Sequence, residues 1–137
     1  MYTLKILSML MFLLAGRPVL THTVWQNERK EFVADAGNMT VTTTLEFLSA
    51  TKVVMRYKSV MPSHPAMYVN PDGSIDTIEG WTSDWESNGT YKCRRGKIII
   101  TFDDESTMEL LYQKVLYNAG VIVGEKYGEK IVFEKQE

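Results

Sequence analysis

Apolar and polar residues alternate with a period of two along most of the chain after residue 23, a pattern typical of β-strands that bury one face. In residues 39–48, for example, Val41, Thr43, Leu45 and Phe47 are expected to face inward. The alternation predicts strands over residues 24–26, 39–48, 52–60, 90–94, 97–102, 107–116, 121–123 and 130–135. Seven or eight strands joined by short connections predict an all-β, antiparallel up-and-down meander. We expect it to close into a small barrel or half-barrel, because closure removes exposed strand edges.

Two segments depart from this pattern. Residues 27–38 are polar and are expected to form a connection. Residues 61–89 contain three of the four prolines and two of the three tryptophans, Trp81 and Trp85. Prolines at this density do not occur in central strands, so we expect a long excursion with one short strand near residues 73–79. Loops of this length in a compact domain are usually functional or disordered, and the aromatic residues favour order.

The N-terminus has the features of a signal peptide. Lys5 gives a short positive start, and residues 6–15 (ILSMLMFLLA) form an apolar run that matches a signal-peptide core rather than a membrane span. We therefore predict a signal peptide at 1–22, a single domain at 23–137 with no transmembrane span, and export to the periplasm or cell surface. Residues 14–16 (LAG) resemble the start of a bacterial lipobox, but Arg17 stands at the position of the lipidated cysteine. A lipid anchor is therefore not predicted.

Composition and charge exclude several classes of function. The 137 residues suffice for one ordinary domain, and removal of Lys5 and Arg17 with the leader takes the net charge from −2 to −4. This acidic balance argues against a nucleic-acid binder and against attraction to an anionic membrane surface. Cys93 is the only cysteine and there are two histidines, which excludes an intramolecular disulfide and metal sites built on several thiolates or histidines. No cofactor is predicted.

The residues that could carry catalysis do not form a recognised motif. There is no Gly-x-Ser-x-Gly sequence, and His64 is the only histidine after residue 22. Cys93 alternates with Tyr91 on a core-facing side, so we expect a buried, inert thiol. Asp84 and Glu86, or the acidic run 103–105, could form a carboxylate pair or a calcium site, although acidic hairpin turns are common without function. A basic cluster at 94–97 is interpreted as a solvated hairpin tip, and we predict a protein that is not an enzyme.

Binding through large apolar side chains is the remaining hypothesis, because the chain has more of them than a small barrel needs to fill its centre. The first hypothesis is an exported binding protein that holds a small apolar or amphiphilic ligand in the barrel mouth, beneath the excursion 61–89. The residues expected to line this site are Trp25, Met55, Tyr57, Tyr68, Trp81 and Trp85. The alternative is a filled barrel that acts as a protein-interaction module in a cell-envelope complex, with the aromatic residues of the excursion exposed. The exposure of Trp81 and Trp85 distinguishes the two.

Four segments carry a resemblance to a known group of proteins. Residues 44–53 (TLEFLSATKV), 88–91 (NGTY), 97–104 (KIIITFDD) and 130–135 (KIVFEK) together resemble the small exported lipocalin-like β-barrel proteins of Bacteroides and related gut bacteria. The resemblance extends from about residue 40 to the end of the chain. It implies a lipocalin-like barrel or half-barrel, located in the periplasm or attached as a lipoprotein, and it implies no particular activity.

Overall fold

The computed structural model describes residues 19–126 and 128–137, so most of the predicted signal peptide lies outside the described residues. The prediction of the fold is confirmed. Eight antiparallel strands close into a barrel in the order β1-β10-β9-β8-β7-β6-β3-β2, which is a meander, and a separate two-stranded ribbon joins β4 to β5. The strands are β1 (Thr23–Val33), β2 (Gly37–Phe47), β3 (Lys52–Met61), β4 (His64–Pro65), β5 (Thr77–Ile78), β6 (Trp81–Arg94), β7 (Lys97–Phe102), β8 (Thr107–Leu111), β9 (Val121–Lys126) and β10 (Glu129–Gln136). The described residues also form a short helix, α2 (Lys114–Asn118).

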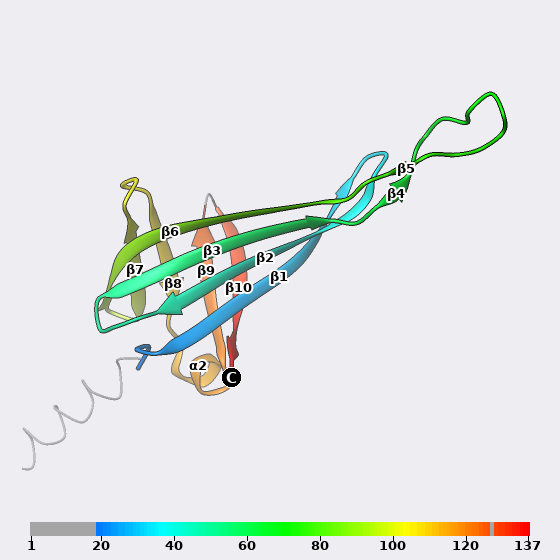
Figure 1. Ribbon diagram of the computed structural model, residues 1–137. Helices are drawn as coiled ribbons and strands as arrows, with labels where there is room; N and C mark the ends of the chain where they lie inside the picture. The colour runs from blue at the N-terminus through cyan, green and yellow to red at the C-terminus, as the bar shows by residue number, and fades with distance from the viewer. Residues whose placement is uncertain (1–18, 127) are drawn as a thin grey trace, which may run out of the picture.

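The barrel is built from two crossed groups of strands. Figure 1 shows the long strands β1, β2, β3 and β6 running diagonally across the shorter strands β7, β8, β9 and β10, which stand nearly upright behind them. β6 belongs to both groups, because it pairs with β3 along its first part and with β7 from Gly89 to Arg94. Gly89 lies where β6 turns from one group into the other. A side chain at this position would lie 2.8 Å from the backbone oxygen of Thr101, so the close approach of the strands requires glycine.

The space between the two groups is filled by apolar side chains. In β2 the predicted inward residues Val41, Thr43, Leu45 and Phe47 are all buried, and the residues between them are half-buried. One continuous core cluster contains Leu20, Trp25, Leu45, Phe47, Val53, Met55, Tyr91, Ile98, Ile100, Phe102, Met108, Leu110, Ile122 and Phe133. An eight-stranded barrel has an interior just wide enough for its own side chains to fill, and that is the arrangement here.

One end of the barrel is closed by α2 and the residues before β1. Leu20 is buried in the core, and the ring of Tyr117 stacks on Trp25 with 5.7 Å between the centroids. The Tyr117 hydroxyl donates a hydrogen bond to the carbonyl of Val19. The indole N–H of Trp25 donates to the Thr23 hydroxyl at 2.9 Å, so the largest core side chain has its polar group satisfied.

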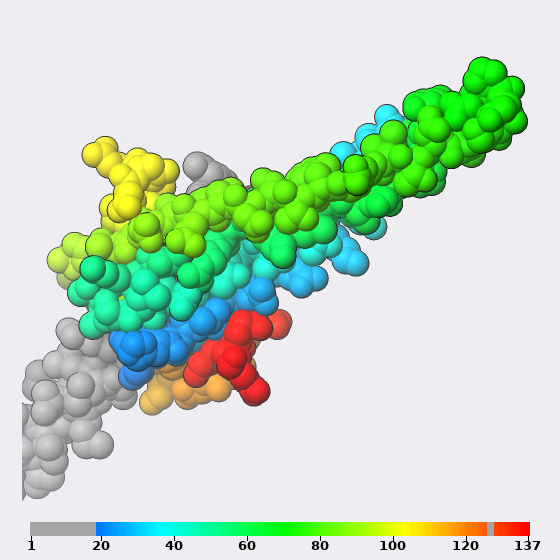
Figure 2. All heavy atoms as spheres, in the orientation of Figure 1, coloured from blue at the N-terminus to red at the C-terminus, as the bar shows by residue number. Residues whose placement is uncertain are grey.

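The four long strands continue beyond the barrel as a projecting arm. β1 pairs with β10 over only three residues, Val24–Gln26, yet it pairs with β2 over eleven. We call residues 27–43 and 57–88 the arm. Figures 1 and 2 show it extending to one side, with the loop between β4 and β5 at its far end.

The arm corrects two predictions. Residues 27–38 were expected to form a connection, but β1 continues to Val33 and β2 begins at Gly37. The excursion expected over 61–89 is shorter, because β6 begins at Trp81, and it contains two short paired strands, β4 and β5, where one was expected. The missed parts of β1 and β6 have one cause: residues 28–30 and 81–86 are exposed on both faces of the sheet, so these segments lack the alternation that marks a half-buried strand. The pairing with neighbouring strands supplies the backbone hydrogen bonds instead.

A third, smaller difference lies at the end of β8. The strand expected over 107–116 stops at Leu111, and residues 114–118 form α2. The apolar residues of this segment pack on the barrel end through Tyr117, a contact that strand periodicity does not predict.

A buried tyrosine, Tyr91, and a half-buried one, Tyr117, give the fold a dependence on pH. Burial raises the pKa of Tyr91 and of Tyr117 above the ordinary phenol value. Because the folded pKa exceeds the unfolded one, the stability from these groups is fully present below about pH 10 and is lost as the pH rises through the raised values. We expect phenolate absorbance to appear later in a titration of the folded protein than of the urea-unfolded chain. Tyr91→Phe should reduce the part of the phenolate absorbance that appears late. Identical titration curves for the folded and the unfolded protein would contradict the prediction.

Candidate functional site

The structure distributes the six predicted site residues over three regions. Trp25 and Met55 belong to the buried core. Tyr57 and Trp85 are cross-strand neighbours in the arm, and their rings stack with centroids 5.5 Å apart and planes 19° apart. Trp81 begins β6 opposite Met61, four residues farther along the arm.

Tyr68 occupies the third region, in the loop at the end of the arm, where its hydroxyl donates to Asp76 Oδ2 at 3.1 Å. The structure thus brings Tyr57 and Trp85 together. Trp81 lies four residues earlier on the same face of β6, and Tyr68 is separate from all three. Trp81 and Trp85 are 49% and 45% exposed. Such exposure is expected of a surface patch and not of residues that line a closed pocket.

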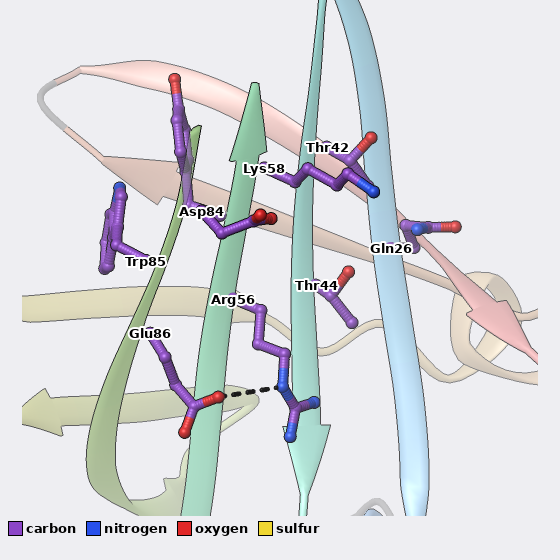
Figure 3. Close-up of a pocket in the computed structure, with 9 residues that line it drawn as sticks. Gln26, Thr42, Thr44, Arg56, Lys58, Asp84, Trp85 and Glu86 are labelled. Carbon is purple, nitrogen blue, oxygen red and sulfur yellow. Dashed lines mark hydrogen bonds and ion pairs between the residues drawn. The ribbon is translucent and has the colours of Figure 1, made fainter. Parts of the chain in front are cut away.

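A shallow groove of about 510 Å³ lies where the arm joins the barrel. It is lined by Gln26, Thr42, Thr44, Arg56, Tyr57, Lys58, Asp84, Trp85 and Glu86 (Figure 3). Arg56 lies between two acids: it pairs with Glu46, and its Nε donates to Glu86 Oε2 at 3.2 Å. The hydrogen bond to Glu46 is the main cause that raises the pKa of Arg56, so this guanidinium is charged throughout the accessible pH range.

Asp84 differs from Glu86 in having no such partner. Lys58 lies directly across the β3–β6 pairing from Asp84, but among the described residues no hydrogen bond or ion pair to the Asp84 carboxylate occurs. Figure 3 shows the Asp84 and Trp85 side chains pointing to opposite sides of β6. The groove residues come from four strands, and only the pairing of those strands brings them together. Only Tyr57 and Trp85 among them were therefore predicted from the sequence as ligand-binding residues.

Exposed apolar side chains gather at the far end of the arm. We call residues 32–37 and 62–80 the distal tip. Its exposed apolar residues are Phe32, Met67, Tyr68, Val69, Ile75 and Ile78. Phe32 and Met67 are the most exposed of these, at 78% and 75%, and both line an open groove of about 450 Å³ between the β1–β2 turn and β4.

Side-chain hydrogen bonds order the loop of the distal tip. Asn70 Nδ2 donates to Ser74 Oγ at 3.0 Å and to Asp76 Oδ1 at 2.9 Å. Asp72 Oδ1 accepts hydrogen bonds from the Ser74 hydroxyl and, at 2.9 Å, from the Ser74 backbone N–H, and these two bonds lower the pKa of Asp72. Gly73 has a φ of +89°, which the turn requires and which glycine adopts without strain. The apolar side chains are therefore displayed on an ordered loop.

The distal tip is acidic. Between residues 62 and 80 the chain has three carboxylates, Asp72, Asp76 and Glu79, and neither lysine nor arginine. Asp35 adds a fourth carboxylate in the β1–β2 turn. His64 is half-buried, and its Nδ1 lies 3.4 Å from the carbonyl of Pro62. The surface therefore combines apolar side chains with negative charge.

Two of the residues considered for catalysis have a structural place in the fold. Cys93 is half-buried and packs against the core. Asp104 Oδ1 accepts the Ser106 backbone N–H at 2.9 Å, so this carboxylate closes its own turn. Within residues 19–126 and 128–137, no group of three or more His, Cys, Asp or Glu side chains is arranged to hold a metal ion.

Comparison of the chain with protein-family models, curated proteins and solved structures gave no match. The resemblance to exported lipocalin-like proteins therefore stays a prediction. In the described part of the chain, no helix has the length and apolar character needed to cross a membrane.

Proposed function

We propose that this protein is a non-enzymatic protein-interaction module, in which the filled barrel supports the arm and the distal tip binds a partner protein. One observation carries the proposal: the inward positions of the barrel are filled by their own side chains, whereas large apolar side chains are exposed at the tip. Apolar residues clustered on a surface are typical of interaction sites. With the predicted signal peptide, the partner would be a protein of the cell envelope.

The order of the tip supports this role. The hydrogen bonds of Asn70 and Asp72 hold the loop in one conformation before any partner arrives. Less conformational entropy is then lost on binding, which favours affinity. The groove beside Phe32 and Met67 has room for an apolar side chain of the partner.

The charge of the tip indicates the chemistry of the partner. Its carboxylates would face a basic rim around an apolar site, and they would be repelled by anionic lipid headgroups. This favours a protein surface over a membrane.

The ligand-binding hypothesis has less support, because Trp25 and Met55 are packed in the core and Tyr68 lies at the far end of the arm. Native mass spectrometry of residues 23–137, compared with the denatured sample, tests it directly. We expect the bare chain; an additional mass of small-molecule size that is lost on denaturation would favour the ligand.

Site-specific photo-crosslinking tests the proposed function. A photoreactive phenylalanine analogue at Phe32 or Met67, in the full chain expressed in its source cells, should give one discrete crosslinked protein. Leu48 and Val115 are matched controls, because both are exposed apolar residues outside the arm. They should not crosslink to that protein.

The captured protein can then be purified and its affinity measured. Phe32→Ser combined with Met67→Ser should weaken binding by tenfold or more, since hot-spot side chains each contribute about 2 kcal/mol or more. Equal crosslinking at all four positions, or unchanged affinity of the double variant, would contradict the proposed function.

A further inference from the structure

One edge of the arm is an unpaired strand. β6 pairs with β3 along Trp81–Thr90 on one side, but on the other side it pairs with β7 only from Gly89 onward. Figure 1 shows this stretch of β6 running along the arm away from β7, its only neighbour in the barrel besides β3. Residues 81–86 are all exposed. Backbone groups along this edge are therefore open to another strand.

The direction of these backbone groups follows from two hydrogen bonds. The carbonyl of Asn88 accepts the N–H of Asp103 at 3.0 Å, so it points away from β3. The N–H of Tyr91 donates to Thr51 at 2.9 Å, so it points towards β3. Successive residues of an antiparallel strand alternate in this respect. The N–H and C=O groups of Thr82, Asp84 and Glu86 consequently face the open side.

The opposite edge of the arm is protected more strongly than this one. Along the open edge of β1, residues 28–31 are four consecutive charged residues, including Lys30. Charged residues, lysine above all, are a common defence of edge strands against further pairing. Residues 81–88 of β6 contain no lysine, arginine or proline. The difference marks β6 as the edge at which a strand can be added.

The side chains along β6 indicate what kind of strand fits. Trp81 and Trp85 project on one face, and Asp84 and Glu86 on the other. Arg56 pairs with Glu86, but the Asp84 carboxylate has no such partner, and Lys58 is one strand farther from the edge. A second copy of β6 would bring the same acids against one another, which is unfavourable for cross-strand neighbours. Self-pairing is therefore disfavoured.

We infer that β6 binds an extended segment of another protein by strand addition over Thr82–Glu86, with apolar residues against Trp81 and Trp85 and basic residues facing Asp84. In this mode main-chain hydrogen bonds give affinity, and alternate side chains give specificity. The inference rests on the proposed function, because it describes how the arm holds its partner beside the contact at the distal tip.

A synthetic peptide of alternating lysine and valine, long enough to span Thr82–Glu86, tests the mode of binding. In the free protein the amide hydrogens of Thr82, Asp84 and Glu86 should exchange quickly, while those of Ser83 and Trp85, bonded to β3, exchange slowly. Adding the peptide should slow the exchange of Thr82, Asp84 and Glu86. Hydrogen exchange followed by NMR reads out each amide separately.

Three controls make the test specific. A peptide with glutamate in place of lysine, and one with N-methylated amides on the pairing edge, should not bind. Asp84→Lys should weaken binding of the lysine–valine peptide roughly fivefold. Glu28→Lys, the same charge change on the protected edge, should leave it unchanged.

The inference is overturned if the lysine–valine peptide does not bind, if it binds without slowing exchange at Thr82, Asp84 and Glu86, or if the N-methylated peptide binds equally well. Crosslinking at Phe32 and Met67 is measured independently of the peptide. Failure of strand addition is therefore distinguishable from failure of the proposed function.

Discussion

Replacing Trp25 with alanine is expected to lower the free energy of unfolding by roughly 3–5 kcal/mol, as for other large-to-small changes in a packed core. The indole is fully buried, and it is the largest of the fully buried side chains. Its removal leaves a cavity and ends the stacking on Tyr117, by which α2 covers the barrel end. Urea unfolding followed by circular dichroism measures the loss.

Trp85→Ala is the matched control, because it removes the same side chain from the arm. Trp85 is 45% exposed and stacks on Tyr57, so the expected loss is about 1 kcal/mol. Equal losses for the two variants would mean that the arm contributes as much stability as the barrel core, contrary to the filled barrel described above.

Gly89→Ala is expected to destabilise the protein by about 1–3 kcal/mol, as overpacking does in close-packed interiors. The new methyl group would lie 2.8 Å from the Thr101 carbonyl oxygen and 3.1 Å from the Phe102 ring. The oxygen belongs to the backbone of β7, so it can move only if the strand moves. Thermal unfolding should show a lower Tm.

Ser87→Ala tests whether the effect is specific to the turn of β6. Ser87 lies two residues before Gly89 on the same face of β6, on the side of the arm, and it is half-buried. Its Tm should stay close to that of the unmodified protein. An unchanged Tm for Gly89→Ala as well would show that β6 can relax around the new methyl group, and would remove the requirement for glycine.

The barrel was predictable from the sequence because water lies on one side of its strands and apolar side chains on the other. The alternation in 39–48 and 97–102 reports this asymmetry directly. Residues 28–30 and 81–86 of the arm were not predictable in the same way, since they meet solvent on both faces. The charged residues 28–31 of β1 therefore read as a connection, although they form a strand.

The candidate site was predictable in composition but not in place. Trp81 and Trp85 were singled out as large aromatic residues, and the structure exposes them on one edge strand. Asp84 matters for binding because it has no ion-pair partner among the described residues and because β6 is unpaired on one side at this position. Both features depend on the register of β2, β3 and β6. Register is not fixed by alternation alone, since any even shift preserves the pattern.

The narrow junction between β1 and β10 has a consequence for how the barrel assembles. Only three residue pairs join these strands, and Asn27 adds a side-chain bond to Val132 at 2.9 Å between positions 105 residues apart. Contacts so distant in sequence carry the greatest loop-closure entropy, whereas each hairpin of the meander closes locally. We therefore expect the hairpins to form before the ring is complete and this junction to pair last on folding, which hydrogen exchange at Val24–Gln26 during refolding would measure.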